Sequence, residues 1–120
     1  MIEKRRHPRK RPEVVLQVTD AMSAEPIGRL GNLSAHGMML IAHGAIADDA
    51  LYQFTFSLPD AHGRLHPLEV GVHELWSEPA RLAGHVWVGF RFIDIGADDA
   101  SVLRGWLENR AAAAAGGFRT

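Results

Sequence analysis

Apolar and polar residues alternate along most of this chain, which is the pattern of β-strands that bury one face. The alternation is clearest in 51–58, where Tyr52, Phe54, Phe56 and Leu58 share one face. Further strands are predicted at 14–19, 27–32, 38–43, 66–78 and 85–94. Because the intervals between them hold no crossover helices, the strands are expected to pair antiparallel in a barrel or sandwich. Closure into a barrel would remove the sheet edges.

The two longest predicted strands each have an apolar face. Leu68, Val70, Val72 and Trp76 share a face in 66–78, and Val86, Val88, Phe90 and Phe92 share one in 85–94. The residues between these strands, 78–84, contain Pro79 and Gly84 and have the composition of a hairpin loop.

The period changes near the end of the chain. After Asp98 and Asp99, apolar residues recur at helical spacing, namely Val102, Leu103, Trp106 and Leu107. The pattern predicts an amphipathic helix over about 98–110, with Trp106 packed in the core; an apolar stripe on a helix could also meet a partner. Ala111 to Ala115 could extend it and Gly116-Gly117 would end it, because alanine is the best helix former and glycine a poor one.

Length and composition limit the architecture. The 120 residues fit a single domain, and we expect a stand-alone one. The chain has no cysteine, so its fold does not depend on disulfides. The charged start and the lack of an apolar run of about 18 residues predict a cytoplasmic protein without signal peptide or membrane insertion.

The charge is unevenly distributed. Residues 4–11 hold six of the thirteen basic residues, whereas the chain after residue 12 carries seven basic and thirteen acidic ones. Such a segment attracts phosphate at long range. We therefore divide the chain into a flexible basic arm (1–12), a barrel with its helix (13–110) and an Ala/Gly-rich tail (111–120).

Metal binding and catalysis have no candidate constellation. Of the seven histidines, His62 and His66 are four apart, but Pro59, Gly63 and Pro67 make this stretch a turn rather than a helix. No serine lies in a nucleophile elbow, and no glycine-rich loop carries the lysine of a phosphate-binding loop. We expect no metal, no cofactor and no enzymatic activity.

Two short polar motifs can recognise a nucleotide. Arg5 and Arg9 lie four apart, and guanidinium groups can fork onto a guanine edge, stack on a base or pair with phosphate. Asn32 and Ser34 are two apart, so on an extended backbone both face one side. Gly37 permits an unusual backbone angle or a close approach. Taken singly, the first motif is typical of a solvated terminus and the second of a polar turn.

Together these residues resemble the PilZ family of bacterial domains that bind the second messenger cyclic di-GMP. Arg5 and Arg9 match the family's Arg-x-x-x-Arg motif, and Asn32, Ser34 and Gly37 match its Asp/Asn-x-Ser-x-x-Gly motif. Trp76 and the run from Gly89 to Ile93 look like later strands of the family. The resemblance implies a six-stranded antiparallel β-barrel followed by a helix, with a mobile arm that wraps the ligand.

The resemblance also implies a role for each residue. Arg5 and Arg9 would contact guanine and phosphate, and Arg6 would add a further contact to guanine or phosphate. Asn32 and Ser34 would form hydrogen bonds with the ligand from the barrel surface. Gly37 would shape the turn, and Trp76 would contact the ligand or cap the barrel. The charged residue before the first arginine, Lys4, favours a ligand pair over one ligand.

A receptor of this kind would act by presenting a changed surface to an unidentified downstream protein. The resemblance suggests machinery for motility, pili, exopolysaccharide and biofilm, or virulence, and we expect a monomer or weak homodimer.

Two other functions fit the same fold. One is an adaptor that has lost ligand binding, which the intact motifs disfavour. The other is a small barrel that binds nucleic acid through its basic arm, but Arg29 is the only basic residue in the first five predicted strands. We therefore expect no nucleic-acid partner.

Overall fold

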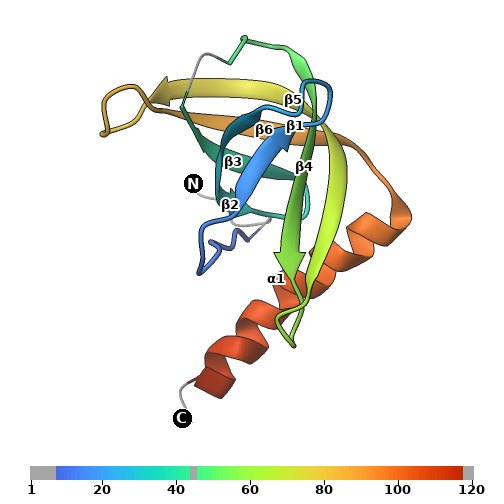
Figure 1. The fold of residues 1–120 in the computed structure, drawn as a ribbon. Helices are drawn as coiled ribbons and strands as arrows, with labels where there is room; N and C mark the ends of the chain where they lie inside the picture. Colours follow the sequence, from blue (N-terminus) through green and yellow to red (C-terminus); the bar gives the residue numbers. More distant parts are fainter. Residues whose placement is uncertain (1–7, 44–45, 118–120) are drawn as a thin grey trace.

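The computed structural model describes residues 8–43 and 46–117, with side chains as far as residue 109. Within these ranges the chain forms β1 (Gln17–Asp20), β2 (Pro26–Leu33), β3 (Gly37–Ala42), β4 (Leu51–Pro59), β5 (Leu65–Pro79), β6 (Val86–Ile95) and α1 (Ala97–Gly117). The six strands close into an antiparallel barrel in the order β1-β2-β3-β6-β5-β4 (Figure 1). The predicted fold is therefore confirmed.

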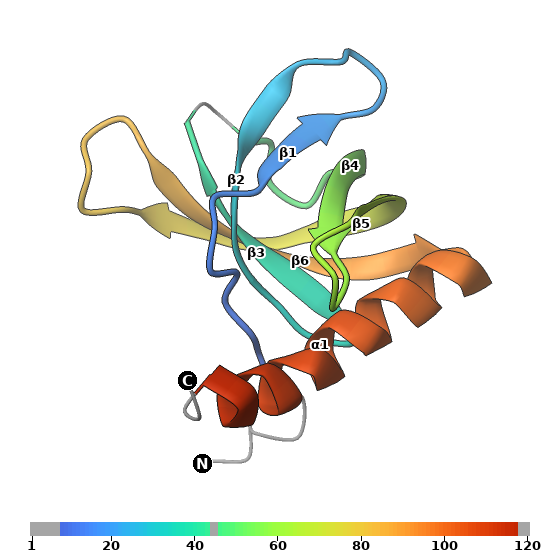
Figure 2. The same ribbon diagram turned by 60° about the horizontal axis from the view of Figure 1, so that its bottom comes forward.

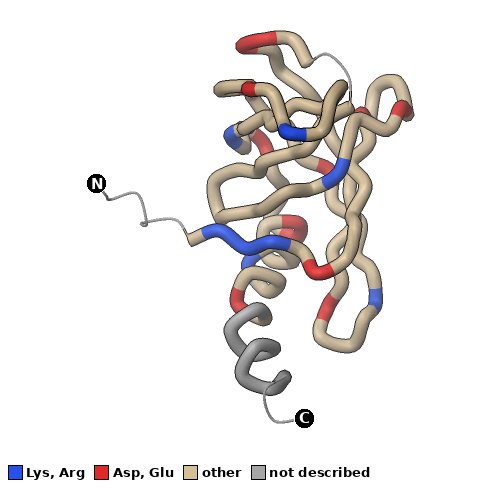
Figure 3. Tube along the Cα trace, turned by 90° about the vertical axis from the view of Figure 1, so that its left-hand side faces the viewer, with Lys and Arg blue, Asp and Glu red and all other residues tan. Residues whose placement is uncertain are grey.

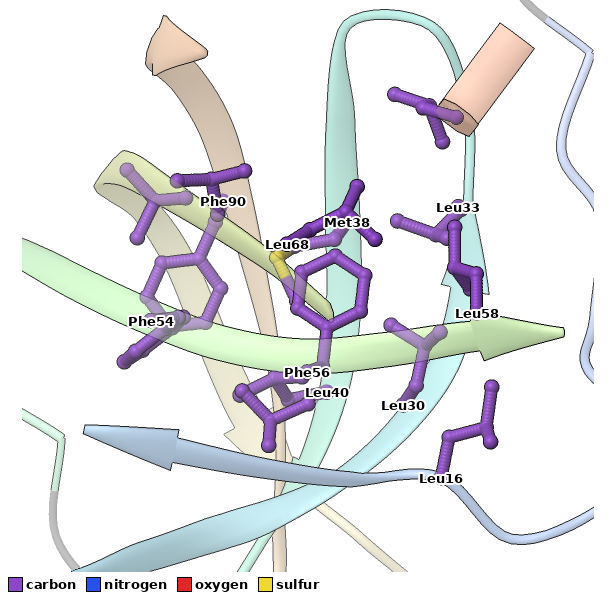
Figure 4. Packing of buried hydrophobic residues seen from close by; sticks show 14 of the residues in the cluster. Leu16, Leu30, Leu33, Met38, Leu40, Phe54, Phe56, Leu58, Leu68 and Phe90 are labelled. Carbon is purple, nitrogen blue, oxygen red and sulfur yellow. The ribbon is translucent and has the colours of Figure 1, made fainter. Parts of the chain in front are cut away.

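The barrel interior is filled by the apolar faces of its strands. Phe54, Phe56 and Leu58 of β4 are buried, as the alternation predicted, and their neighbours in the interior come from all other strands (Figure 4). The rings of Phe54 and Phe90 meet edge to face with centroids 5.0 Å apart, a favoured arrangement for aromatic pairs. The core thus lies inside the barrel and leaves the outer face of the sheet for recognition.

The first strand is shorter than predicted. The alternation suggested 14–19, but β1 begins at Gln17, and Val14 and Val15 are exposed. Leu16 and Val18 are nevertheless buried, as expected. The register between β1 and β2 shifts directly after Val18, so the regular pairing of β1 with β2 is short. Apolar alternation thus identified the buried residues but not the start of strand pairing.

The fifth strand departs from the predicted pattern at Trp76. Its register with β6 shifts between Glu74 and Trp76. A bulge of this kind adds a residue to one strand and exchanges the two faces beyond it. Leu68, Val70 and Val72 are buried as predicted, but Glu74 takes the next inward position and Trp76 is 42% exposed. The prediction that Trp76 shares their buried face is therefore wrong.

Helix α1 lies across one end of the barrel (Figures 1 and 2). Its side chains Leu103 and Trp106 are buried in the core, which confirms the predicted amphipathic face. The helix continues beyond residue 110 to Gly117, as the helix propensity of alanine allows. Within the described residues, no helix is long and apolar enough to cross a bilayer.

Candidate functional site

The two polar motifs meet on the surface of the barrel. The Nη1 atom of Arg9 donates a hydrogen bond of 2.6 Å to the Oδ1 atom of Asn32. These residues lie 23 positions apart in the sequence, so the contact depends on the path of the arm along β2. Arg5 and Arg6, which were also predicted to bind the ligand, lie outside the described residues.

The backbone after Arg9 is held against the end of β2. The amide of Lys10 donates to the carbonyl of Leu33 at 2.8 Å, and the amide of Leu33 donates back at 2.9 Å. The Lys10 side chain extends to α1, where its Nζ atom donates to the Trp106 carbonyl at 2.6 Å and lies 3.9 Å from the ring centroid. A cation over an indole is attractive. Lys10 therefore connects the arm to both the barrel and α1.

Ser34 shapes the turn that follows β2. Its amide donates to the carbonyl of Gly37 at 2.9 Å, and its hydroxyl accepts the amide of His36 at 3.2 Å. The residue is 1% exposed, whereas Asn32 is half-buried. The shared face expected for the two side chains does not extend to Ser34, whose side chain is buried at the turn that follows the end of β2 at Leu33. Direct contact between Ser34 and a ligand stays a prediction.

Gly37 is required by a close approach between strands. A Cβ atom at this position would lie far inside van der Waals contact with the carbonyl oxygen of Phe90, and only 3.4 Å from the Cα atom of Arg91. These are backbone atoms of β6, which cannot rotate away. Of the two roles predicted for this glycine, the structure therefore shows the close approach.

Trp76 lies in the same row of the sheet as Asn32. The strand register places Asn32 opposite Met39, Met39 opposite Gly89, and Gly89 opposite Trp76. The indole of Trp76 covers the position where a Cβ atom of Gly89 would stand. With strands about 4.8 Å apart, the row spans roughly 14 Å. An aromatic side chain thus lies beyond Asn32 on the outer face, and it does not cap the barrel interior.

The site is basic on the side of the arm. Residues Arg9 to Arg11 form a continuous basic stretch, whereas acidic residues are scattered over the rest of the molecule (Figure 3). Burial lowers the pKa of Arg9 below its ordinary value. A guanidinium nevertheless remains ionised in proteins, so Arg9 offers a charged fork of donors beside the Asn32 amide.

Two histidines in the described part of the chain pair with aspartates. His66 Nε2 lies 2.9 Å from Asp60 Oδ2, and His73 Nε2 lies 2.6 Å from Asp49 Oδ1. The hydrogen bond from His66, followed by that from the amide of His62, lowers the pKa of Asp60 to about 2. No three acidic or histidine side chains among the described residues are placed to share a metal ion.

The buried carboxylate of Glu74 was missed by the sequence analysis. It is 3% exposed, accepts the amide of Asp49 at 2.6 Å and accepts the hydroxyl of Ser77 at 2.9 Å. The bond from the Asp49 amide attaches the loop before β4 to β5 close to Trp76. Glu74 lies two positions after Val72, so an acidic residue on the predicted buried face was a visible signal. The predicted alternation did not include the bulge between Glu74 and Trp76.

Comparison with known proteins identifies the family. The computed structure is similar to Bacillus subtilis inhibitor of motility (MotI/DgrA), with a TM-score of 0.73, 17% identity, and coverage of 92% of this chain and 53% of that one. It is also similar to the PilZ domain of YcgR from Escherichia coli with c-di-GMP (TM-score 0.67, 14% identity, 98% and 100% coverage). A third similar structure is Escherichia coli YcgR in complex with c-di-GMP (TM-score 0.68, 16% identity, 98% and 51% coverage).

The chain therefore spans about half the length of MotI and of the longer YcgR chain. At these identities the similarity establishes the fold alone. No curated protein matches the sequence. The profile of the PilZ domain matches residues 3–109, which is most of the chain and includes both motifs. This chain belongs to the PilZ domain family.

Proposed function

We propose that this chain is a cytoplasmic receptor for cyclic di-GMP that acts on another protein. The observation that carries the proposal is the hydrogen bond between Arg9 and Asn32, which joins one residue of each motif on the outer face of the barrel. Two similar structures, both of YcgR, contain c-di-GMP. The family, the fold and the joined motifs support the same ligand.

The chemistry of the ligand fits the residues of the arm. Cyclic di-GMP carries two negative charges and two guanines, and arginine can pair with phosphate, fork onto the guanine edge or stack on the base. In the proposal Arg5 and Arg9 contact guanine and phosphate, and Arg6 adds a further contact. Asn32 already accepts a hydrogen bond from the Arg9 guanidinium. Its side-chain amide can both accept and donate hydrogen bonds on the same surface.

The other motif residues support this surface. Ser34 and Gly37 set the turn that follows Asn32, and we propose that Ser34 also bonds the ligand when the arm moves. Trp76, in the same row as Asn32, offers an indole ring for contact with a base. Stacking of a base on an aromatic side chain contributes about 1 to 3 kcal/mol.

The expected affinity follows from two opposing contributions. Ordering the backbone of each arm residue costs roughly 1 to 2 kcal/mol. Each charge-assisted hydrogen bond returns about 1.5 to 3 kcal/mol, so several bonds must form together. We expect binding of about −8 kcal/mol, which corresponds to a micromolar dissociation constant.

Arm closure is the proposed output of the receptor. Lys10 connects the arm to α1, so a ligand that favours the closed arm changes a surface shared by the arm and the helix. Such a ligand shifts the population because it binds one state better. A downstream protein, for which motility machinery is a candidate because one similar structure is an inhibitor of motility, would recognise this surface.

Isothermal titration calorimetry with cyclic di-GMP tests the proposal. The full chain is compared with Arg5→Ala, Arg9→Ala and Asn32→Ala, and with Arg64→Ala as a control in the turn between β4 and β5. We expect micromolar binding by the wild type and the control, and binding that is lost or strongly weakened in both arm variants.

Each other outcome has a definite meaning. Unchanged affinity in Arg5→Ala or Arg9→Ala would contradict the arm mechanism. Absence of binding by the wild type would indicate an adaptor that does not sense the ligand. Strong, salt-dependent binding of single-stranded RNA without a response to cyclic di-GMP would indicate a nucleic-acid-binding barrel.

A further inference from the structure

A groove lies beside the candidate site on the outer face of the barrel. It runs between the chain segment 11–15 and strands β2, β3 and β6, and it has a volume of about 510 Å³. Met39, Ile41 and Trp87 contribute apolar surface to it, and Asn32 is among its lining residues. The groove therefore continues the surface on which Arg9 and Asn32 meet.

Trp87 occupies a position made available by a glycine. It pairs with Ile41 of β3, and its indole extends over that strand to β2, where the Cζ3 atom would be 3.0 Å from a Cβ atom of Gly31. The Cε atom of Met39 would be 3.5 Å from the same point. A larger residue in place of Gly31 would displace the ring. The half-buried indole thus rests on the sheet and still lines the groove.

Contacts between side chains connect Trp87 to the motif residues. Arg9 donates to Asn32, and the Nδ2 atom of Asn32 lies 3.9 Å from the Sδ atom of Met39. Met39 and Trp87 then converge over Gly31. An apolar surface that begins at the polar groups of the motif therefore continues into the groove.

Two arginines border this apolar surface. Arg11 and Arg29 line the groove and are exposed, and neither guanidinium has a hydrogen-bond or ion-pair partner among the described residues. One acidic residue, Glu13, also lines it. Arg29 lies in the part of the chain after residue 12, which has an excess of acidic residues, whereas Arg11 belongs to the basic arm. The groove therefore brings one cation of the arm and one of the barrel to the same surface as the indole. Guanidinium groups of this kind bind phosphate or the guanine edge.

We propose that Trp87, Arg11 and Arg29 form a guanine-binding subsite in which the base stacks on the indole and the arginines bind its edge or its phosphate. The inference rests on the proposed binding of cyclic di-GMP and extends it. The base comes either from the second half of the same ligand or from a second ligand molecule, since both present the same chemistry.

Calorimetric titration of the full chain with cyclic di-GMP tests the subsite. Trp87→Leu removes the aromatic face but keeps apolar bulk, and Arg29→Ala removes an exposed guanidinium with little risk to folding. Arg64→Ala, an exposed arginine outside the groove, is the matched control. Thermal melts of all variants verify that each is folded. We expect Trp87→Leu and Arg29→Ala to weaken binding about tenfold or to remove one binding event, and the control to bind like the wild type.

The stoichiometry separates the two sources of the base. A fall from two ligands to one would place a second ligand molecule in the groove, and a weaker affinity at constant stoichiometry would place the second guanine of one ligand there. Folded Trp87→Leu and Arg29→Ala that both bind like the wild type would overturn the subsite and leave the proposed function intact. A wild-type protein that does not bind would overturn both.

Discussion

Replacement of Gly37 by alanine tests whether the last position of the second motif serves packing. The added Cβ atom would overlap the carbonyl oxygen of Phe90 and lie 3.3 Å from its carbonyl carbon. Non-bonded heavy atoms pack best at about 3.5 to 4 Å, so β3 and β6 must separate locally by roughly 1 Å. The substitution therefore acts on the sheet itself, at the end of the ladder.

The expected loss of stability follows from the interactions at this point. Separation weakens the pairing of Gly37 with Arg91 and the bond from the amide of Phe92 to the carbonyl of His36, which is 2.9 Å long. Each backbone hydrogen bond contributes about 1 kcal/mol net, and overpacking of a tight contact costs about 1 to 3 kcal/mol. We expect Gly37→Ala to lower the free energy of unfolding by about 2 to 3 kcal/mol, or the Tm by roughly 10 °C.

Urea denaturation and calorimetric melting measure this change, and Gly105→Ala supplies a matched control. Gly105 lies in α1, and a Cβ atom added there would meet nothing within 4 Å. Alanine is favoured over glycine in a helix by about 1 kcal/mol. The same substitution should therefore destabilise the protein at Gly37 and stabilise it at Gly105.

A Gly37→Ala protein as stable as the wild type would refute the packing argument. If such a protein also failed to bind cyclic di-GMP, the glycine would serve the ligand directly. Reduced stability with binding restored at low temperature would instead agree with a role in holding the turn.

Two further predictions concern other parts of the barrel. Gly89→Ala should displace the indole of Trp76, because the indole occupies the space of the new Cβ atom. The indole N–H resonance of Trp76 should therefore shift in an NMR spectrum. A resonance that does not move would contradict this placement of the indole. The Asp60 carboxyl should titrate near pH 2, because the hydrogen bond from His66 lowers its pKa, and His66→Ala should raise the midpoint. Since the pKa of Asp60 is depressed in the folded protein, this contribution to stability is present above about pH 4 and is lost as the pH falls through 2. Carbon-detected NMR titration measures the pKa of Asp60 in both proteins. Equal midpoints in the wild type and His66→Ala would refute the assignment.

Much of the fold could be predicted because its signals are local. Alternation in β4 located Phe54, Phe56 and Leu58 in the core, and helical spacing located Leu103 and Trp106 on the buried face of α1. A side chain's face in a regular strand depends only on its position along that strand. The same rule failed at Trp76, because a bulge exchanged the faces and the register of β6 decides where a bulge forms.

The candidate site was predictable as a set of residues but not as a geometry. The motif spacing indicated Arg9, Asn32 and Gly37, whereas burial of Ser34 depends on where β2 ends. The position of Trp87 over Gly31 could not be foreseen, since the two residues come from strands that are separated by β3 in the barrel.

The sequence by itself determined the family, the faces of the regular strand segments and the residue types that can bind a guanine nucleotide, because each depends on neighbours along the chain. Tertiary structure alone decided that Arg9 reaches Asn32, that Lys10 attaches the arm to α1, and that a groove continues toward Trp87. These contacts join segments that meet only after the barrel closes. Their geometry is set by cross-strand register and by the path of the arm, and neither is encoded in the spacing of any single motif.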